Sequence, residues 1–382
     1  MEKILIVHTN YQNIGGEDIA VKNEISFLEK YFQVETLLYS NVVKNYFLQA
    51  VFFLFNKNTN SMKILEQKIS EFKPDIVYVH NTWFKASLGI FKILSKKKIK
   101  TIIKLHNFRY FCTKSFLSKK HLENKSICGA CGMKNEKVGI FNKYFSNSFI
   151  KSFFMIRYGK KYFEILKNHN FDIVVLTNFH REFLENLDFK KNKLHVIPNY
   201  IEIDESLIQV DRKNIIYAGR ISKEKGINKL IDAFLESKLR DWSLKIYGNG
   251  PEYTSLSEKC KKIKNIEFFG EKDNEEIIES IKESSAVVTA TTLYEGQPTL
   301  LCEASILGIP SIFPKTGGIE EFFPSSYKLS FDPNNFDDFV NKVNLLDDLD
   351  SIKKQGIENQ NYIKNYLNKD KILEGFKNLF YE

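Results

Sequence analysis

Two glutamates stand eight positions apart in the segment TLYEGQPTLLCEASILGIP, residues 292–310. The segment predicts a helix that opens at Pro298 or Thr299, because the missing N–H of proline has no helical partner in a first turn. The free N–H groups and the positive dipole end of such a helix suit a diphosphate. Glu303 lies one turn beyond Thr299 and could reach ribose hydroxyls, while Glu295 precedes the helix, near the position of a sugar. The alternative interpretation is that neither residue binds a ligand, with Glu295 solvated in a loop and Glu303 on the surface of a helix.

Arg220 and Lys225 follow an apolar run, residues 214–220, that predicts a strand. Two cations at the end of a strand can neutralise a pyrophosphate, and also the charge that develops on it as it leaves. Taken singly, each is more simply a surface cation at the start of a helix.

His106 ends another predicted strand, residues 101–107, at the edge where parallel sheets bind ligands. His8, His80 and His195 also lie near strand ends. For a histidine outside a motif, a structural role is the simpler interpretation. His106 is singled out from these histidines by its motif context, HNFRYFC.

The elements that must position these residues alternate between strands and helices. Apolar runs predict buried parallel strands at residues 3–9, 75–81, 101–107, 171–178 and 193–199, and then at 214–220, 243–250, 265–270, 285–291 and 310–315. Helical patterns fall at 19–28, 180–187, 226–238 and 353–380. This alternation predicts two doubly wound α/β domains in tandem, with a ligand in the cleft between them at the carboxyl ends of the strands.

The glutamate segment resembles the donor site of glycosyltransferase family 4, through the pattern S/T-x-x-E-G-x-P followed by E-A-x-x-x-G-x-P. Other marks of the family occur in the expected order. YAGRISKEKG (217–226) resembles its strand–G-R–x4–K-G pattern, IYGNGP (246–251) its glycine turn, and Gly317-Gly318 its glycine pair after the next strand. The resemblance is most specific in these segments and implies that Arg220 and Lys225 bind the donor diphosphate.

The first half carries the same resemblance, which spans nearly the whole chain. Gly15-Gly16-Glu17 resembles the family's glycine loop, which lies close to the donor phosphate and the acceptor. HNFRYFC (106–112) resembles the H-N-x-R-x-x-C motif of a subgroup common among polysaccharide-assembly enzymes. The implied role of His106 is at the donor sugar, through its imidazole or its backbone carbonyl.

The resemblance implies the GT-B fold, an α/β fold in which two Rossmann-like doubly wound domains face each other across a cleft. It implies a retaining glycosyltransferase that requires no cofactor and takes a UDP- or GDP-sugar as donor. The expected transfer is of a hexose or N-acetylhexosamine to a lipid-linked or free glycan, in the synthesis of a capsule, O-antigen or similar polysaccharide. The implied catalytic residues are His106, Glu295, Arg220 and Lys225. The implied donor-binding residues are Gly15, Gly16, Arg220, Lys225, Gly248, Glu295, Gly296, Gln297, Pro298, Thr299, Leu300 and Glu303.

The polar stretch after Pro198-Asn199 predicts the domain boundary. We expect an acceptor-binding domain at 1–204 and a nucleotide-sugar-binding domain at 205–355. A C-terminal helical segment at 356–382 is expected to pack back on the first domain.

Two other functions are compatible with the same fold. A nucleotide-sugar epimerase is disfavoured by the Glu-Gly-x-Pro segment, which is typical of the transferases. A non-catalytic, membrane-associated assembly partner is disfavoured because the charged residues of the motifs are intact, namely Arg220, Lys225, Glu295 and Glu303.

Cys112, Cys128 and Cys131 give the spacing C-x15-C-x2-C, with His121 between them. Thiolates and an imidazole at such spacing could hold a structural zinc ion. The subgroup often carries a further Cys downstream, which this chain lacks, so reduced thiols in a loop are weighed slightly above a metal site. The proposed chemistry requires no metal.

The two halves of the chain differ in charge. Residues 1–200 contain 32 Lys and Arg against 16 Asp and Glu, a balance of +16, whereas the remainder has 24 against 31, a balance of −7. An apolar helical stripe in the basic half consists of Phe141, Phe145, Phe149 and Phe153, and its cations are Lys143, Lys151, Arg157, Lys160 and Lys161. Basic and aromatic side chains favour docking on an anionic membrane surface. Packing of the stripe in the core is the alternative.

No segment predicts export or a membrane span. The opening MEKILIVHTN lacks the pattern of a signal peptide, and the apolar stretch Tyr46–Phe55 is shorter than the about 20 residues that a bilayer requires. Five Cys in such a chain argue against a disulfide framework. We therefore expect a cytoplasmic protein, peripheral on the inner face of the cytoplasmic membrane, with no nucleic-acid partner.

Overall fold

The computed structural model describes residues 2–11, 16–41, 51–52, 54–112, 148–203 and 213–381. The chain divides into two compact units, Met1–Tyr200 with Lys369–Glu382, and Ile201–Asn368. Each unit contains a six-stranded sheet in which the paired strands are parallel. The architecture is therefore α/β with two doubly wound units. Residues 356–368, assigned above to the C-terminal segment, belong to the second unit.

The sheet of the first unit has the order β2-β1-β3-β4-β5-β6. Its strands are β1 (Lys3–Asn10), β2 (Gln33–Ser40), β3 (Ile76–Val79), β4 (Lys100–Leu105), β5 (Asp172–Val175) and β6 (Leu194–Val196). The central strands are buried on both faces, which is why their sequences are continuous apolar runs. The sequence analysis missed β2, an edge strand that is largely half-buried and therefore lacks such a run.

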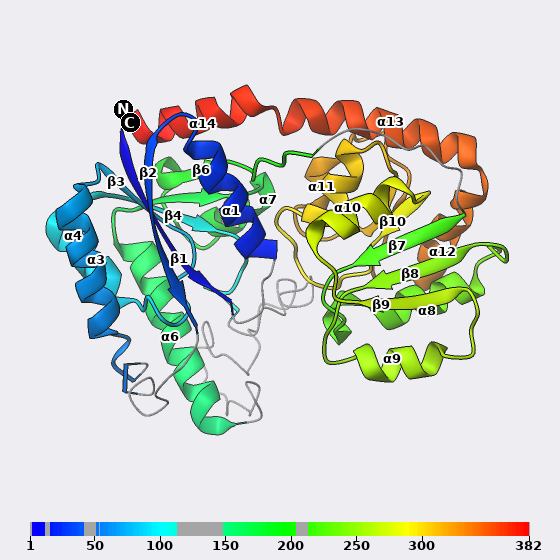
Figure 1. Ribbon diagram of the computed structural model, residues 1–382, viewed down its shortest axis with the longest axis horizontal. Helices are drawn as coiled ribbons and strands as arrows, with labels where there is room; N and C mark the ends of the chain where they lie inside the picture. The colour runs from blue at the N-terminus through cyan, green and yellow to red at the C-terminus, as the bar shows by residue number, and fades with distance from the viewer. Residues whose placement is uncertain are drawn as a thin grey trace. The chain divides into compact units, whose positions relative to one another are not determined.

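Helices cover both faces of this sheet. They are α1 (Gly16–Leu28), α3 (Thr59–Phe72), α4 (Gly89–Lys97), α6 (Phe149–Asn168), α7 (Asn178–Glu185) and α14 (Lys369–Tyr381). Helix α1 connects β1 to β2, and α3 connects β2 back across β1 to β3. Because the two connections run in opposite directions across the sheet and both crossovers are right-handed, α1 and α3 lie on opposite faces. The C-terminal helix α14 lies beside α1, where the rings of Phe27 and Phe376 are 6.4 Å apart (Figure 1).

The sheet of the second unit has the order β12-β11-β10-β7-β8-β9. Its strands are β7 (Asn214–Ala218), β8 (Ser243–Tyr247), β9 (Ile266–Gly270), β10 (Ala286–Val288), β11 (Ser311–Pro314) and β12 (Ser330–Phe331). The strand order reverses between β7 and β10, and doubly wound sheets bind ligands at the carboxyl ends of the two strands beside such a switch point. The two-residue strand β12 was also missed, because it is too short to show a pattern.

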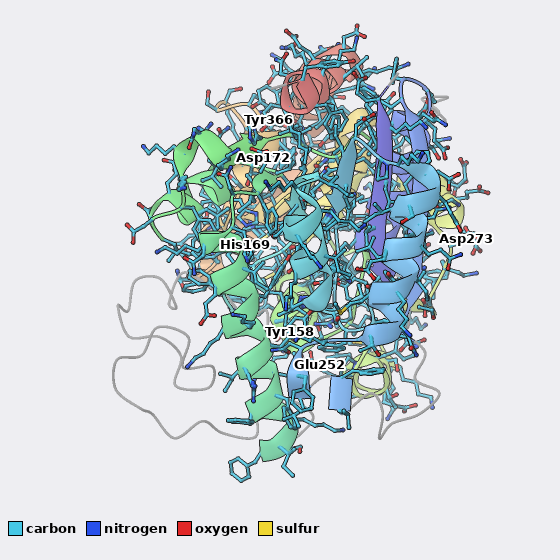
Figure 2. The ribbon with its side chains drawn as sticks, turned by 90° about the vertical axis from the view of Figure 1, so that its left-hand side faces the viewer. Tyr158, His169, Asp172, Glu252, Asp273 and Tyr366 are labelled. Carbon is cyan, nitrogen blue, oxygen red and sulfur yellow. The ribbon has the colours of Figure 1, made fainter. Side chains whose placement is uncertain are left out.

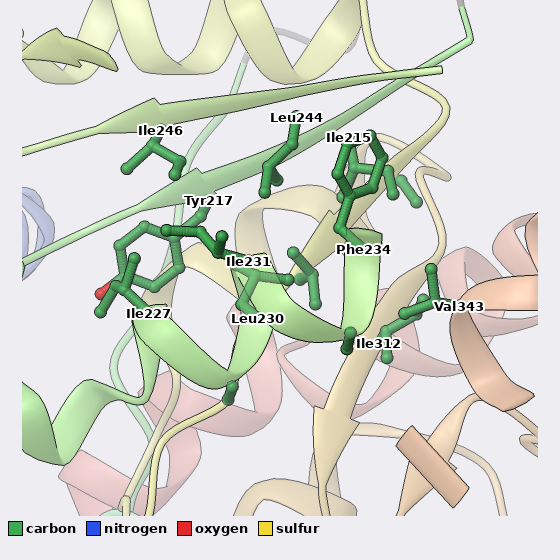
Figure 3. Packing of buried hydrophobic residues seen from close by; sticks show 14 of the residues in the cluster. Ile215, Tyr217, Ile227, Leu230, Ile231, Phe234, Leu244, Ile246, Ile312 and Val343 are labelled. Atoms are coloured by element: carbon green, nitrogen blue, oxygen red, sulfur yellow. The ribbon is translucent and has the colours of Figure 1, made fainter. Parts of the chain in front are cut away.

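The core of the second unit lies between this sheet and helix α8 (Ile227–Glu236), as Figure 3 shows. On α8, Ile227, Ile231 and Phe234 face strand residues that include Leu244 and Ile246. The remaining α-helices are α9 (Tyr253–Cys260), α10 (Asn274–Lys282), α11 (Thr299–Ile306), α12 (Phe336–Asn344) and α13 (Leu349–Tyr366). The predicted helical pattern over 353–380 is confirmed and consists of two helices, α13, which ends at Tyr366 in the second unit, and α14, which begins at Lys369 in the first.

Candidate functional site

Two loops meet at the switch point of the second sheet, residues 219–226 after β7 and residues 289–298 after β10. The backbone N–H and Oγ1 of Thr292 both donate to the carbonyl oxygen of Glu224, at 2.9 and 3.1 Å. Gly226 has φ +73°, and a Cβ there would lie 2.1 Å from the carbonyl oxygen of Ala290. Glycine is therefore required for the loops to touch. The two motifs that the sequence analysis identified separately form one surface.

Lys225 and Glu295 form an ion pair on this surface, with 2.5 Å between Nζ and Oε1. The hydroxyl of Thr291 donates to the same carboxylate oxygen at 3.1 Å. The side chains of Lys225 and Glu295 are 27% and 25% exposed, so a ligand can reach them. Thr291 was not singled out from the sequence, although it lies within the same segment.

The backbone of Glu295 is held by the glycine pair after β11. The N–H of Gly318 donates to the carbonyl oxygen of Glu295 at 2.9 Å. Gly317 has φ +61°, and a Cβ there would lie 2.6 Å from the same oxygen. The glycine pair therefore fixes the loop that presents the Glu295 carboxylate.

Arg220 lies beside this pair and forms its own ion pair with Glu224. Burial would raise the pKa of Glu224, but hydrogen bonds and the Arg220 guanidinium hold that pKa below its ordinary value. The hydroxyl of Tyr217 donates to the carbonyl oxygen of Arg220 at 3.0 Å. Burial, and then the negative charge of Glu295, raise the pKa of Tyr217, so its hydroxyl stays protonated. Sequence reasoning missed Tyr217, which resembles any other apolar residue of strand β7.

Gly248 belongs to the turn after β8 and supports the loop after β7 from its other side. Its φ is +121°, and a Cβ there would lie 2.0 Å from the carbonyl oxygen of Gly219. The N–H of Ile221 donates to the carbonyl oxygen of Asn249 at 2.9 Å. The glycine turn therefore sets the backbone of the Arg220 loop.

Helix α11 begins at Thr299, as predicted. Pro298 is the N-cap residue of this helix, whereas the sequence analysis placed it in the first turn. The carbonyl oxygen of Pro298 accepts from the N–H groups of Leu301 and Cys302. The cap contributes no side-chain hydrogen bond, so the amides of Thr299 and Leu300 are available to an anion. Gly296 and Gln297, which lead into the helix, are buried.

Glu303 lies on α11 and is 5% exposed. Burial raises its pKa to about 7, and a hydrogen bond with the side chain of Asn274 opposes the rise. Asn274 is the first residue of α10 and was missed, because no motif in the sequence marks it. The carboxyl group therefore changes charge near neutral pH.

In the first unit, His106 follows β4 and contacts His80, which follows β3. Nε2 of His106 lies 2.9 Å from Nδ1 of His80. On the neighbouring strand β1, Nε2 of His8 lies 2.8 Å from a carboxylate oxygen of Asp18. Two of the histidines that the sequence analysis set aside therefore lie in a row with His106 at the carboxyl ends of β1, β3 and β4.

A second polar network surrounds the start of α1. The carboxylate of Glu17 accepts from the hydroxyl of Tyr11 at 2.7 Å and from Nδ2 of Asn107 at 3.0 Å. Nη1 of Arg109 donates to the same hydroxyl at 3.2 Å. Burial raises the pKa of Glu17. Asn107 and Arg109 belong to the motif HNFRYFC, in which the sequence analysis assigned roles only to His106 and Cys112.

The predicted glycine loop is only partly covered by the structure. Gly16 begins α1 and is exposed, and Gly15 lies outside the described residues. Among the described residues, a Cβ at Gly16 would meet no atom within 4 Å. The first turn of α1 carries Glu17 and Asp18, whose carboxylates suit hydroxyl groups of a ligand better than phosphate.

The predicted zinc site cannot be assembled from the described residues. Cys112 is buried, and Cys128, Cys131 and His121 lie outside the described ranges. Within those ranges, no three His, Cys, Asp or Glu side chains gather closely enough to hold a metal ion.

Comparison with known proteins gives a family match for the second unit. Residues 200–369 match the family described as "Glycosyl transferases group 1". The amylovoran biosynthesis glycosyltransferase AmsD of Erwinia amylovora is 28% identical over 192 residues, which are 48% of this chain and 54% of AmsD. A glycosyltransferase of Haemophilus influenzae is 25% identical over 215 residues, which are 54% of this chain and 60% of that protein. The chain thus spans little more than half the length of these curated relatives.

The fold matches solved structures over almost the whole chain. HepE of Anabaena, solved with UDP and glucose, superposes with a TM-score of 0.70 and 13% sequence identity, covering 99% of both chains. The similarity, together with the two parallel six-stranded sheets, shows the GT-B fold of two Rossmann-like units.

Proposed function

We propose that this chain is a retaining glycosyltransferase that moves a sugar from a nucleotide-sugar donor to a glycan or lipid-linked glycan in polysaccharide synthesis. The observation that carries the proposal is the Lys225–Glu295 ion pair at the switch point of the second sheet. It joins a cation and a carboxylate from two motifs, beside the uncapped N-terminus of α11. This combination suits a ligand that has both a diphosphate and hydroxyl groups.

Each charged residue has a separate role in this proposal. The amides of Thr299 and Leu300 bind the diphosphate with Arg220 and Lys225, for which both cations must exchange their present carboxylate partners for phosphate oxygens. Glu303 accepts hydrogen bonds from the ribose hydroxyls. Gly248, Gly296, Gln297 and Pro298 shape the backbone around the nucleotide, Glu295 binds the donor sugar, and His106 acts at that sugar.

The reaction exchanges one bond at the anomeric carbon for another on the same face of the sugar. The bond to the diphosphate oxygen breaks as the acceptor oxygen forms its bond, and the acceptor proton passes to the departing diphosphate. Arg220 and Lys225 stabilise the charge that develops on the diphosphate. No protein nucleophile and no cofactor enter this scheme.

The similar proteins favour a UDP-sugar and a polysaccharide product. HepE was solved with UDP and glucose, and AmsD is named for amylovoran biosynthesis. We therefore propose UDP-hexose or UDP-N-acetylhexosamine as the first donors to test, with GDP-sugars next. The acidic first turn of α1, with Glu17 and Asp18, suits the hydroxyl groups of a glycan acceptor.

A thermal-shift panel of nucleotide sugars tests the proposal. A donor present at 100 times its dissociation constant should stabilise the protein by about 2.7 kcal/mol, which raises the melting temperature measurably. The same donor should then release nucleoside diphosphate when a glycan acceptor is added. Absence of a shift with every nucleoside diphosphate and nucleotide sugar would contradict the proposal, whereas conversion of the donor without an acceptor would favour an epimerase.

We also propose that helix α6 docks the protein on an anionic membrane surface. Phe149, Ile150 and Phe153, near the start of α6, are 50%, 70% and 47% exposed. The exposed cations of the helix are Lys151, Arg157, Lys160 and Lys161. Figure 2 shows α6 with Tyr158 midway along it, on the buried side. The stripe residues Phe141 and Phe145, and with them Lys143 and most of Tyr46–Phe55, lie outside the described residues.

Apolar rings beside cations match the interface of an anionic bilayer, where each basic residue contributes about 1 kcal/mol. In the described part of the chain, every helix is too short or too polar to cross a membrane. Docking, and not insertion, is therefore the proposal, and it agrees with a lipid-linked acceptor at the inner face of the cytoplasmic membrane.

Liposome co-sedimentation tests the docking. The protein should pellet with anionic vesicles at low salt and remain soluble with neutral vesicles or at high salt, because screening weakens the attraction. The double variant Lys160→Glu/Lys161→Glu should lose most of the binding, and Lys261→Glu, an exposed lysine of the second unit, should not. If the unmodified protein stays in the supernatant with anionic vesicles at low salt, the membrane proposal is wrong.

A further inference from the structure

The imidazoles of His80 and His106 form a direct hydrogen bond in the first unit. Val79 of β3 pairs with Ile103 of β4, so the residues that follow each strand come close together. Nδ1 of His80 lies 2.9 Å from Nε2 of His106, with 5.2 Å between the ring centroids and 23° between the ring planes. His80 is 3% exposed, and its backbone N–H donates to Val7 at 2.9 Å. Its position is therefore fixed by the sheet.

Both rings are neutral near pH 7. Burial, and then the charges of His106, Lys104 and His8, hold the pKa of His80 well below its ordinary value. Burial, and then the charges of Lys104, His8 and His180, do the same for the pKa of His106. Lys104 is itself buried, with Nζ 2.5 Å from a carboxylate oxygen of Glu24. One ring must therefore donate N–H to a bare nitrogen of the other.

The second nitrogen of His80 decides the direction of this hydrogen bond. Nε2 of His80 is buried and has no partner among the described residues. A buried N–H without an acceptor is rarer in proteins than a buried acceptor without a donor. The proton of His80 therefore belongs on Nδ1, from which it is donated to Nε2 of His106.

We propose that His80 is a positioning residue that holds His106 in the tautomer with its proton on Nδ1. His106 then offers its ligand a hydrogen-bond donor and not a general base. In the described part of the chain, His80 is the hydrogen-bond partner of the His106 ring, which leaves Nδ1–H for an oxygen atom of the ligand. If the proposed function is correct, this oxygen is a hydroxyl or ring oxygen of the donor sugar.

Histidine ¹⁵N NMR of the ligand-free full-length protein tests the tautomer. The signals of His106, identified by their loss in His106→Asn, should show a protonated Nδ1 and a bare Nε2. His80→Asn retains a donor near the position of Nδ1 and should preserve this state. His80→Phe removes the donor and should shift His106 toward the other tautomer. His195→Phe, at a histidine bound to Asp172, is the matched control and should leave His106 unchanged.

Kinetics provide the second measurement. His80→Phe should lower kcat by about tenfold, the effect of one misdirected hydrogen bond, while UDP binding stays the same. His80→Asn should recover most of the loss. A protonated Nε2 of His106 in the unmodified protein, or an unchanged tautomer in His80→Phe, overturns the inference. Because the NMR measurement uses no ligand, a failure to bind any nucleoside diphosphate would reject the proposed function without deciding the tautomer.

Discussion

Replacing Lys225 by alanine is expected to lower kcat for sugar transfer by about 10²- to 10³-fold, the usual effect of removing one group that stabilises developing charge. In the ligand-free protein Lys225 is paired with Glu295. When the donor binds, we expect Nζ to move to a diphosphate oxygen, whose charge increases as the sugar departs. The loss therefore falls mainly on the transition state, and donor affinity should change much less. Steady-state kinetics with a direct measurement of nucleotide binding separate the two effects.

A neighbouring lysine provides the control for this experiment. Lys223 lies in the same short 3-10 turn, η2 (Lys223–Lys225), and is exposed. Both substitutions remove one positive charge from the loop. If the position of the Lys225 charge is what matters, Lys223→Ala should retain nearly full activity. A Lys225→Ala enzyme with near-normal kcat, or an equal loss in Lys223→Ala, would remove the diphosphate role from Lys225.

Glu303→Gln should stabilise the ligand-free protein and weaken donor binding at the same time. Burial raises the pKa of Glu303 from 4.5 to about 7. The folded state therefore binds more protons than the unfolded state between these values, and stability falls as the pH rises through this window. Above pH 7 the ionised carboxylate destabilises the fold by about 3 kcal/mol. The neutral amide of glutamine removes this penalty.

Calorimetry at two pH values tests the stability effect. At pH 8 the variant should melt several degrees higher than the unmodified protein, and at pH 5 the difference should nearly vanish. Donor affinity should fall by about 10- to 100-fold, because glutamine loses the charged acceptor for the ribose hydroxyls. Glu258→Gln, at an exposed carboxylate, should change neither property. If Glu303→Gln leaves the melting temperature at pH 8 unchanged, burial does not raise the pKa of the Glu303 carboxyl as described above.

The fold was predictable where burial dictates composition. The runs at 3–9, 75–81 and 214–220 were predicted correctly as strands, because both faces of a parallel strand need apolar side chains. Strands β2 and β12 were missed, because one lies at a half-buried edge and the other has two residues. Sequence pattern reports burial, so elements that are short or partly exposed leave little signal.

The candidate site was predictable as motifs but not as contacts. Lys225 and Glu295 were selected separately, and only the structure shows them as one ion pair across two loops. Asn274 modulates Glu303 from another helix, and His80 contacts His106 from another strand. A side chain that contacts a motif residue from another helix or strand has no fixed spacing from it in the sequence. Such contacts can therefore be found only in the three-dimensional structure.

The division of the chain has a consequence for synthesis. The second unit is a continuous segment, Ile201–Asn368, inserted between the two parts of the first. Helix α14 follows that segment and supplies Phe376 and Phe380, which are buried with Phe27 and Phe32 of the first part. On the ribosome, the second unit can therefore complete its fold while the first still lacks its closing helix. The apolar surface that packs against α14 stays exposed until α14 has been synthesised, and in this interval the nascent chain is most in need of a chaperone.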